Sequence, residues 1–377
     1  MSFAPERTNL LNTVTLDDIE RIALGAGILG TGGGGNPYLG SLHLRETIRQ
    51  YGPARIVDPH DLADDALVPL CGFIGAPTAS VEKLEAGTEL IGALRLLEEH
   101  VGRPISAIGI AEIGGANSLA PLVAGIQAGL PIVDCDSMGR AFPELPMSVF
   151  FFQAGVPVTP LAMVDAAGNS AIIPYTVDAK WAERLARTLA TSMGATAGLA
   201  GSMVTGAQVK QYGIHYTLSL SKYLGQRVLT AQANGDDVPT VIAQTLEGKI
   251  ILRGKITDLN RRTTQGFARG TLTIESFGGQ DQLDIEFQNE FLIAYLNGEV
   301  VATVPDLISI VTDDSGEPIS TEVLRYGMRV AVLGIPASPA LKTPEALAVV
   351  GPRAFGYDVD FQPLPGGCIG NKPETNG

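Results

Sequence analysis

Three carboxylic acids follow short apolar runs in the middle of the chain, and their spacing suggests acid–base chemistry. Glu112 follows the run over residues 105–111, and Asp134 and Asp136 follow the run over residues 130–133. Residues two apart in an extended backbone share a face, so the two aspartates should lie together. Closely spaced carboxyls acquire different pKa values and can act as a general acid and a general base. We therefore predict that Glu112, Asp134 and Asp136 are catalytic residues.

These carboxylates also have structural interpretations. Glu112 could cap the helix that follows it, and the aspartates could be turn residues. Three converging carboxylates would also suit a hard divalent cation, whereas the four histidines show no ligand spacing that favours zinc. No cofactor is certain from the sequence, and a divalent metal held by Glu112, Asp134 and Asp136 is the one candidate.

A βαβ unit should position these residues. The two apolar runs read as buried strands, and Leu119 to Ala128 reads as the helix between them. Strands joined in this way are parallel and end at the same edge of a sheet, where open α/β folds bind ligands. Asn117, before the helix, and Arg140, after the second strand, are substrate-binding candidates at this edge. Arg140 could equally pair with one of the aspartates.

A glycine-rich stretch provides the second candidate for ligand binding. Asn36 followed by Pro37 is typical of a helix start, so the glycines before them should join two helices. Free N–H groups before a helix attract anions and carbonyl oxygens. The substrate-binding candidates in this stretch are Gly32, Gly33, Gly34, Gly35 and Asn36. A helix before the glycines and the lack of a Lys-Ser/Thr pair argue against a nucleotide phosphate loop, and a tight connector without a ligand is the alternative.

Composition and charge exclude several classes of protein. The chain has 377 residues, of which 45% are hydrophobic and 18% charged, so we expect a globular protein of at least two domains. The net charge of −14 argues against binding to nucleic acid or anionic membranes. No apolar run approaches the roughly 18 residues of a membrane span, and the N-terminus does not resemble a signal peptide. Three widely spaced cysteines indicate reduced thiols and a cytoplasmic protein.

The order of the predicted elements indicates an α/β plus α+β multidomain fold. A parallel α/β sheet domain should be followed by a domain that is rich in antiparallel strands. The predicted parts are residues 1–165, residues 166–362 with a β-rich region over 246–337, and a mobile tail over 363–377. Residues 175–245 could pack with either domain. Within the first domain, a helix should begin at Ser80 and continue through Leu97.

Four stretches of the sequence resemble one family. They are GTGGGGNPYLG (30–40), EIGGANSLAPLVAG (112–125), LPIVDCDSMGRAFPELPM (130–147) and VPDLISIVTDDSGEPISTEVLRYGMRVAVLGIPA (304–337). Together they resemble the DUF917 family, now named for S-methyl thiohydantoin desulfurase, as an N-terminal and a C-terminal family domain between Leu16 and Phe361. The family commonly has a small residue such as alanine between the two aspartates, so Cys135 departs from its pattern. This departure argues against Cys135 as an essential nucleophile.

The resemblance implies an enzyme that removes sulfur from a thiohydantoin ring by hydrolysis and yields a hydantoin. It also implies the company of hydantoinase and oxoprolinase-type proteins. Our first hypothesis is therefore a hydrolase of a small-molecule heterocycle that forms a homo-oligomer. The alternative is a non-catalytic subunit of a hydantoinase/oxoprolinase-type complex, which would expose an apolar patch.

Overall fold

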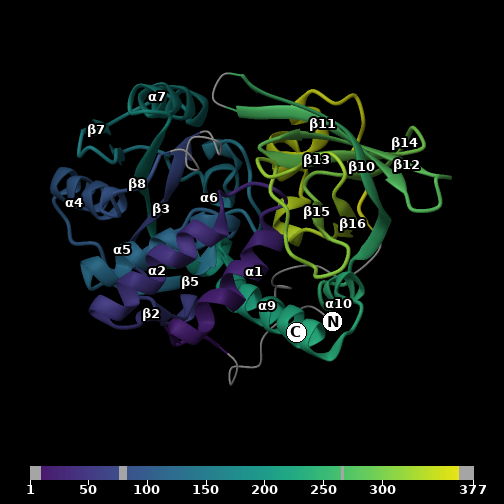
Figure 1. Ribbon diagram of the computed structural model, residues 1–377. Helices are drawn as coiled ribbons and strands as arrows, with labels where there is room; N and C mark the ends of the chain where they lie inside the picture. Colours follow the sequence, from purple (N-terminus) through teal and green to yellow (C-terminus); the bar gives the residue numbers. More distant parts are fainter. Residues whose placement is uncertain (1–9, 76–82, 265–266, 365–377) are drawn as a thin grey trace, which may run out of the picture.

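Two β-sheets organise the computed structural model, which describes residues 10–75, 83–264 and 267–364. The first is a mixed sheet covered by helices, and the second is an antiparallel sheet. In Figure 1 the mixed sheet lies on the left, the antiparallel sheet on the right, and α1 (Ile19–Leu29) between them. This arrangement confirms the predicted fold class, an α/β part followed by a β-rich part.

The mixed sheet has the strand order β1-β2-β5-β4-β3-β8-β6-β7, with β9 paired to β5. Strands β2, β5, β4 and β3 are parallel, and the other pairings are antiparallel. The strands are β1 (Thr13–Val14), β2 (Ala54–Val57), β3 (Leu67–Gly75), β4 (Ile108–Ile110), β5 (Ile132–Asp136), β6 (Leu161–Val164), β7 (Ser170–Ile173), β8 (Thr196–Thr205) and β9 (Ile214–His215).

The predicted βαβ unit is confirmed. Strand β4 leads through a 3₁₀ turn and the helix α5 (Ala120–Ala128) into the parallel strand β5. Gly129 ends α5 in the left-handed conformation, with a φ of 69°. The second strand is longer than predicted, because both aspartates continue the ladder: Asp136 pairs with Ile110. Asp134 and Asp136 are therefore strand residues rather than turn residues.

Helices cover both faces of the mixed sheet. Alternate residues of β6 point to opposite faces of the sheet. Ala162 and Val164 pack in the apolar cluster that contains α4 (Glu89–Val101). Leu161 and Met163 pack in the cluster that contains α7 (Ala179–Ser192). The remaining α-helices are α2 (Pro37–Tyr51), α6 (Val149–Phe152), α8 (Gly206–Tyr212), α9 (Thr217–Asn234), α10 (Val238–Thr245) and α11 (Pro344–Val350). Short 3₁₀ helices lie at Leu16–Asp18, Pro59–Asp61, Gly115–Ser118, Leu145–Met147, Pro339–Leu341 and Pro352–Phe355.

The helix expected from Ser80 begins later. Ser80 itself lies outside the described residues, and α4 starts at Glu89. Gly87 has a φ of 81°, and Leu84 is 82% exposed rather than on a buried helix face. A left-handed residue cannot continue a right-handed helix, so Gly87 separates Leu84 from α4.

Residues 175–245 divide between the two sheets. Strand β8 lies between β3 and β6 in the mixed sheet, and α9 packs along α1. At the end of this region α10 packs against the antiparallel sheet, on β10 and β16. Arg187 of α7 also reaches that sheet, with its guanidinium 4.3 Å from the centroid of the Phe267 ring of β11. The domain boundary expected at residue 165 therefore falls inside the mixed sheet, where β6 and β7 form a hairpin. Sequence analysis did not predict β8, because its small residues give no clear alternation.

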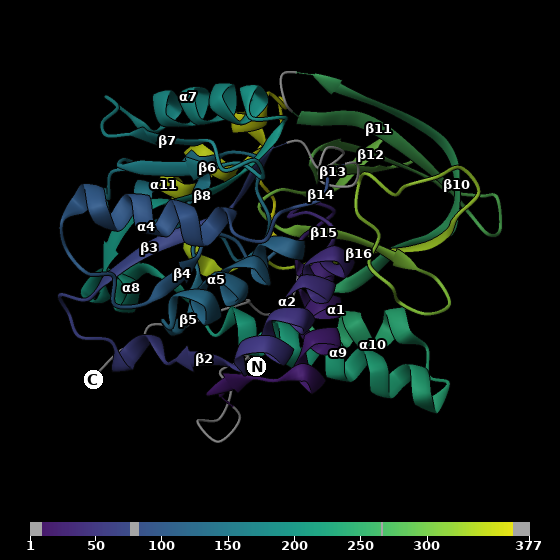
Figure 2. The same ribbon diagram turned by 60° about the vertical axis from the view of Figure 1, so that its left-hand side comes forward.

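The antiparallel sheet has the order β14-β13-β12-β11-β10-β16-β15. Figure 2 shows these strands from another side, with the long β10 at their outer edge in that view. Asn297 and Gly298 make the hairpin turn between β13 and β14, and both have a positive φ. The strands are β10 (Lys249–Thr264), β11 (Phe267–Ser276), β12 (Gln282–Gln288), β13 (Glu290–Leu296), β14 (Glu299–Thr303), β15 (Leu307–Thr312) and β16 (Arg329–Ile335).

The tail expected to be mobile from residue 363 begins with an ordered contact. Leu364 is buried, and its N–H donates to the Asp306 carboxylate over 2.7 Å. Residues 365–377 lie outside the described residues. Within residues 10–75, 83–264 and 267–364, no helix has both the length and the apolar character of a membrane span.

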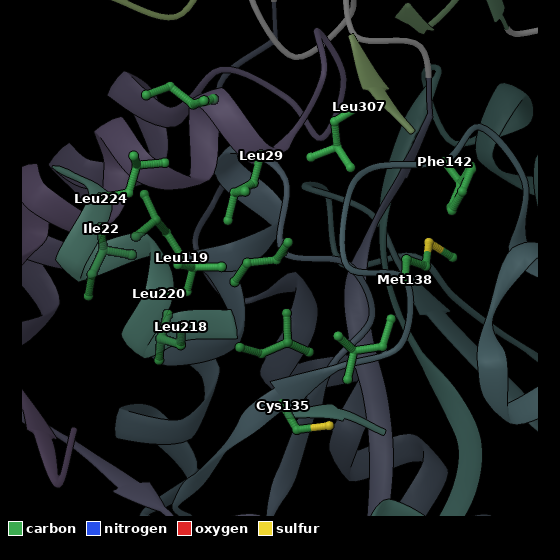
Figure 3. Packing of buried hydrophobic residues seen from close by; sticks show 14 of the residues in the cluster. Ile22, Leu29, Leu119, Cys135, Met138, Phe142, Leu218, Leu220, Leu224 and Leu307 are labelled. Atoms are coloured by element: carbon green, nitrogen blue, oxygen red, sulfur yellow. The ribbon is translucent and has the colours of Figure 1, made fainter. Parts of the chain in front are cut away.

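One apolar cluster joins the two parts of the molecule. Figure 3 shows Leu29 of α1 and Leu307 of β15 in the same cluster as Leu218 of α9 and Phe142, which follows β5. All four side chains are at most 5% exposed. Burial of large side chains of this kind contributes about 1.5–3 kcal/mol each to the stability of the fold. Because residues from both parts pack in one cluster, the two sheets share a core at their junction.

Candidate functional site

A cavity of about 130 Å³ opens where the two sheets meet. We call it the interface cavity. Its walls include residues of the glycine-rich loop, the end of β3, the loop after β5 and the start of β13. It therefore lies beside the βαβ unit, as ligand sites of α/β sheets do, but the antiparallel sheet supplies part of the wall. The predicted site residues that line it are Gly34, Gly35, Asn36, Glu112 and Asn117.

Glu112 reaches this cavity from the segment after β4. Its side chain is 8% exposed, and both of its oxygens accept hydrogen bonds. Oε1 accepts from Nδ2 of Asn117 over 2.6 Å, and Oε2 accepts from the N–H of Phe142 over 3.1 Å. Burial raises the pKa of Glu112 to about 7, while these donors and nearby arginines oppose the rise. A carboxyl with this pKa can take up or release a proton near neutral pH.

Asn117 positions Glu112. Its amide makes a two-way contact with the backbone of β3: Oδ1 accepts from the N–H of Phe73 over 2.7 Å, and Nδ2 donates to the Phe73 carbonyl over 3.2 Å. The same Nδ2 also donates to Glu112. Because these contacts engage the amide, Asn117 fixes the orientation of the Glu112 carboxylate within the cavity wall.

Asp134 lies away from the interface cavity, at the N-terminus of α9. Its Oδ1 accepts from the N–H groups of Leu218 at 3.0 Å and Ser219 at 3.2 Å, and its Oδ2 accepts from the Ser219 hydroxyl. These bonds satisfy N–H groups that the first turn of a helix leaves unpaired. We infer that Asp134 is a structural cap supplied by β5.

Asp136 is also held by backbone groups. Its Oδ2 accepts from the N–H groups of Ile113, Met138 and Gly139, at 3.0, 3.1 and 2.8 Å. Burial raises its pKa to about 7, against the effect of these donors. The contacts fix the turns after β4 and β5 relative to one another.

The three-carboxylate metal site considered from the sequence does not form. Glu112 faces the cavity, whereas Asp134 binds the start of α9 and Asp136 binds the two turns. In the part of the chain that the structure describes, no group of three His, Cys, Asp or Glu side chains is placed to hold a metal ion. The start of α9 occupies the position beside Asp134.

Replacing Asp134 by alanine should distinguish a structural role as a helix cap from a catalytic role. The change leaves two N–H groups of α9 without their acceptor, and we expect the free energy of unfolding to fall by about 1–3 kcal/mol. Turnover by the folded fraction should stay within a few-fold of the wild type. Urea titration and steady-state kinetics on one preparation measure both quantities. A loss of turnover without a loss of stability would restore Asp134 as a catalytic candidate.

Arg140 binds protein rather than facing the cavity. Its side chain is 0% exposed, and its guanidinium donates to the carbonyls of Ala141, Pro305, Asp306 and Phe291 and to the Thr31 hydroxyl. The guanidinium also lies over the Phe142 ring, 4.9 Å from its centroid. These contacts connect the loop after β5 and the glycine-rich loop with the antiparallel sheet. Arg140 is thus a structural residue, but the expected pairing with Asp134 or Asp136 is not among its contacts with the described residues.

The glycine-rich loop joins α1 and α2 as predicted, and Asn36 caps α2 through a 2.9 Å bond from the Tyr38 N–H. Its glycines allow the loop to pack closely against Phe291 on one side and against Gly114 on the other. A Cβ at Gly32 would lie 2.6 Å from the Phe291 ring, and one at Gly34 would lie 2.3 Å from the Gly114 carbonyl. Gly34 and Gly35 line the cavity, and their N–H groups donate no hydrogen bond to another described residue.

The charged cavity residues that were missed from the sequence include Glu290 and Arg187. Glu290, at the start of β13, is 2% exposed, and Arg187 of α7 donates to Glu183 and to the Pro143 carbonyl. Glu290 directly precedes the apolar run over residues 291–296, much as Glu112 follows one, and this position could have identified it. Arg187 lies on a regular amphipathic helix, which gives no chemical signal.

Comparison with known proteins agrees with the resemblance of the sequence motifs. The N-terminal domain of S-Me-THD-like proteins matches residues 17–175, and the C-terminal domain matches residues 177–364. A crystal structure of a protein from Chromobacterium violaceum is similar in fold, with a TM-score of 0.80, 24% identity, and coverage of 93% of this chain and 99% of that chain. No curated protein matches. Because the two family domains together span almost the whole described chain, the protein belongs to the S-Me-THD-like family.

Proposed function

We propose that the protein is a hydrolase that removes the sulfur substituent from a thiohydantoin-type ring and leaves a hydantoin. The observation that carries this proposal is the Glu112 carboxyl. It lines a small cavity, and burial raises its pKa to about 7. Membership of the S-Me-THD-like family supports the substrate class. The cavity volume of about 130 Å³ favours a ligand of one small ring over a nucleotide.

Glu112 would act as the general base in this reaction. Its ionised carboxylate would take a proton from a water molecule as the water oxygen attacks the ring carbon that bears sulfur. The carbon–oxygen bond forms, the carbon–sulfur bond breaks, and an S-methyl substrate releases its thiol with one proton. The proton that stays on the new hydroxyl moves to the ring nitrogen as the hydantoin carbonyl forms. Asn117 and the Phe142 N–H hold the carboxylate in place, which reduces the entropy cost of reaching the transition state.

The glycine-rich loop would bind the ring. Gly34 and Gly35 line the cavity, and their N–H groups donate no hydrogen bond to another described residue, which leaves them available for a ring carbonyl. A carbonyl opposite the sulfur-bearing carbon would become more polarised when bound in this way. Hydrogen bonds of this kind are worth most where water is excluded.

Incubation with S-methyl thiohydantoin tests the proposal. We expect methanethiol, detected with a thiol reagent, and hydantoin, detected by mass spectrometry, in equal amounts. In heavy-oxygen water the new carbonyl should carry the heavy isotope. A Glu99→Gln protein is a matched control, because Glu99 is exposed on α4. Absence of turnover by wild-type protein on both S-methyl and unsubstituted thiohydantoins would contradict this function.

A further inference from the structure

Glu290 is the second buried carboxyl of the interface cavity, and it comes from the other sheet. It is 2% exposed and begins β13. Its neighbour Asn289 has a φ of 58°, and the Asn289 side chain accepts from the Ala268 N–H over 2.8 Å. The Asn289 carbonyl in turn accepts from the Thr321 hydroxyl over 2.7 Å. These contacts fix the backbone that carries Glu290 at the cavity wall.

Gly33 leaves room for this carboxyl. A Cβ at Gly33 would lie 1.9 Å from Oε1 of Glu290, a distance at which atoms collide. The glycine-rich loop therefore packs directly against the Glu290 carboxyl. The other oxygen, Oε2, is buried and has no hydrogen-bond partner among the described residues. A buried polar atom without a partner is costly unless a ligand or a proton satisfies it.

The hydrogen bonds distinguish the two carboxyls. Each oxygen of Glu112 accepts from an N–H donor, which favours the ionised form. Glu290 has no such donor on Oε2, so its ionised form is poorly compensated. The charged groups around Glu290 are Glu112, Arg140 and Arg187. Burial and the charge of Glu112 raise the pKa of Glu290 well above its usual range, although the two arginines oppose the rise.

We propose that Glu290 is the general acid of the reaction and works as a pair with Glu112 across the junction of the two sheets. This inference rests on the proposed function and deepens it. In the forward step, Glu112 accepts a proton from the attacking water, and Glu290 gives its proton to the departing sulfur. Methanethiol then leaves as the neutral thiol. Transfer of one proton from Glu112 to Glu290 restores the starting state.

Leaving-group dependence tests the role of Glu290. A general acid matters for a basic leaving group such as methanethiolate, and much less for a more acidic thiolate such as trifluoroethanethiolate, which is also small. We expect Glu290→Gln to lower kcat on S-methyl thiohydantoin by roughly 100-fold or more, and to stay within a few-fold of the wild type on S-trifluoroethyl thiohydantoin. Glu112→Gln should be slow on both substrates. An equal loss on both substrates in Glu290→Gln would overturn the assignment.

Infrared spectroscopy provides a readout that does not require turnover. Spectra of wild-type protein with isotope-labelled glutamate should be recorded at a pH well above 7, where Glu112 is ionised. The difference between wild-type and Glu290→Gln spectra should contain the C=O stretch of one protonated carboxyl, and Glu112→Gln should keep this band. A difference spectrum without the band would refute a protonated Glu290. Failure of the hydrolase proposal would instead appear as wild-type protein that has the band but no activity on either substrate.

Discussion

Glu112→Gln should lower kcat by roughly 100-fold to 10,000-fold while the protein stays folded. The amide keeps the size of the side chain and an oxygen that can accept from Asn117, but it cannot accept a proton from water. The Phe142 N–H would then face an amide group in place of a carboxylate oxygen. Steady-state kinetics on S-methyl thiohydantoin measure the loss, and the circular dichroism spectrum verifies the fold.

The pH dependence provides the control for this prediction. Because the base must be ionised, kcat/KM of the wild type should rise as the pH passes about 7, the pKa of Glu112. The folded protein binds this proton more tightly than the unfolded chain does, so the free energy of unfolding should fall between pH 4.5 and about 7. In Glu112→Gln, kcat/KM should no longer rise near pH 7, and the free energy of unfolding should fall less between pH 4.5 and about 7. Full activity in Glu112→Gln would exclude Glu112 as the base.

Arg140→Met should reduce the free energy of unfolding by about 3–5 kcal/mol. Methionine fills part of the volume but leaves four buried carbonyls and the Thr31 hydroxyl without their donor. The change also removes a positive charge that lowers the pKa of Glu112, so that pKa should rise. Urea denaturation measures the stability, and the pH profile of kcat/KM measures the shift.

A surface arginine is the matched control for Arg140. Arg49 makes only an exposed pair with Glu46 at 4.0 Å, so Arg49→Met should change stability by less than about 0.5 kcal/mol. Arg140→Lys should also be destabilising, because one ammonium group cannot replace a planar fork of donors. If Arg140→Met were as stable as Arg49→Met, the network would have no net stabilising role.

Local patterns in the sequence predicted the elements around the site well. The apolar runs, Asn36 before Pro37 and Gly129 after α5 gave the βαβ unit and the connector between α1 and α2. The pattern of apolar runs also predicted that Glu112 lies beside the start of a helix. In the structure Glu112 lines the interface cavity. Each of these signals depends on residues close together in the chain. The catalytic role of Glu112 itself stays a proposal.

Contacts distant in sequence could not be predicted in the same way. Asp134 was grouped with Glu112 because two parallel strands end together, but the start of α9 satisfies its carboxylate from 84 residues further along the chain. Glu290 meets Gly33 only because the antiparallel sheet packs against the glycine-rich loop. A single sequence carries no local mark of such packing, so the contact between Glu290 and the glycine-rich loop could not be predicted from it.

The position of β8 has a consequence for synthesis of the chain on the ribosome. This strand fills the space between β3 and β6, yet it belongs to the C-terminal family domain. Until residue 205 has left the ribosome, the buried strand β3 has an unpaired edge, and the β6–β7 hairpin has no neighbour to join. An unpaired apolar edge of a β-sheet promotes aggregation. The nascent N-terminal half should therefore require protection, such as that given by a chaperone, until β8 emerges.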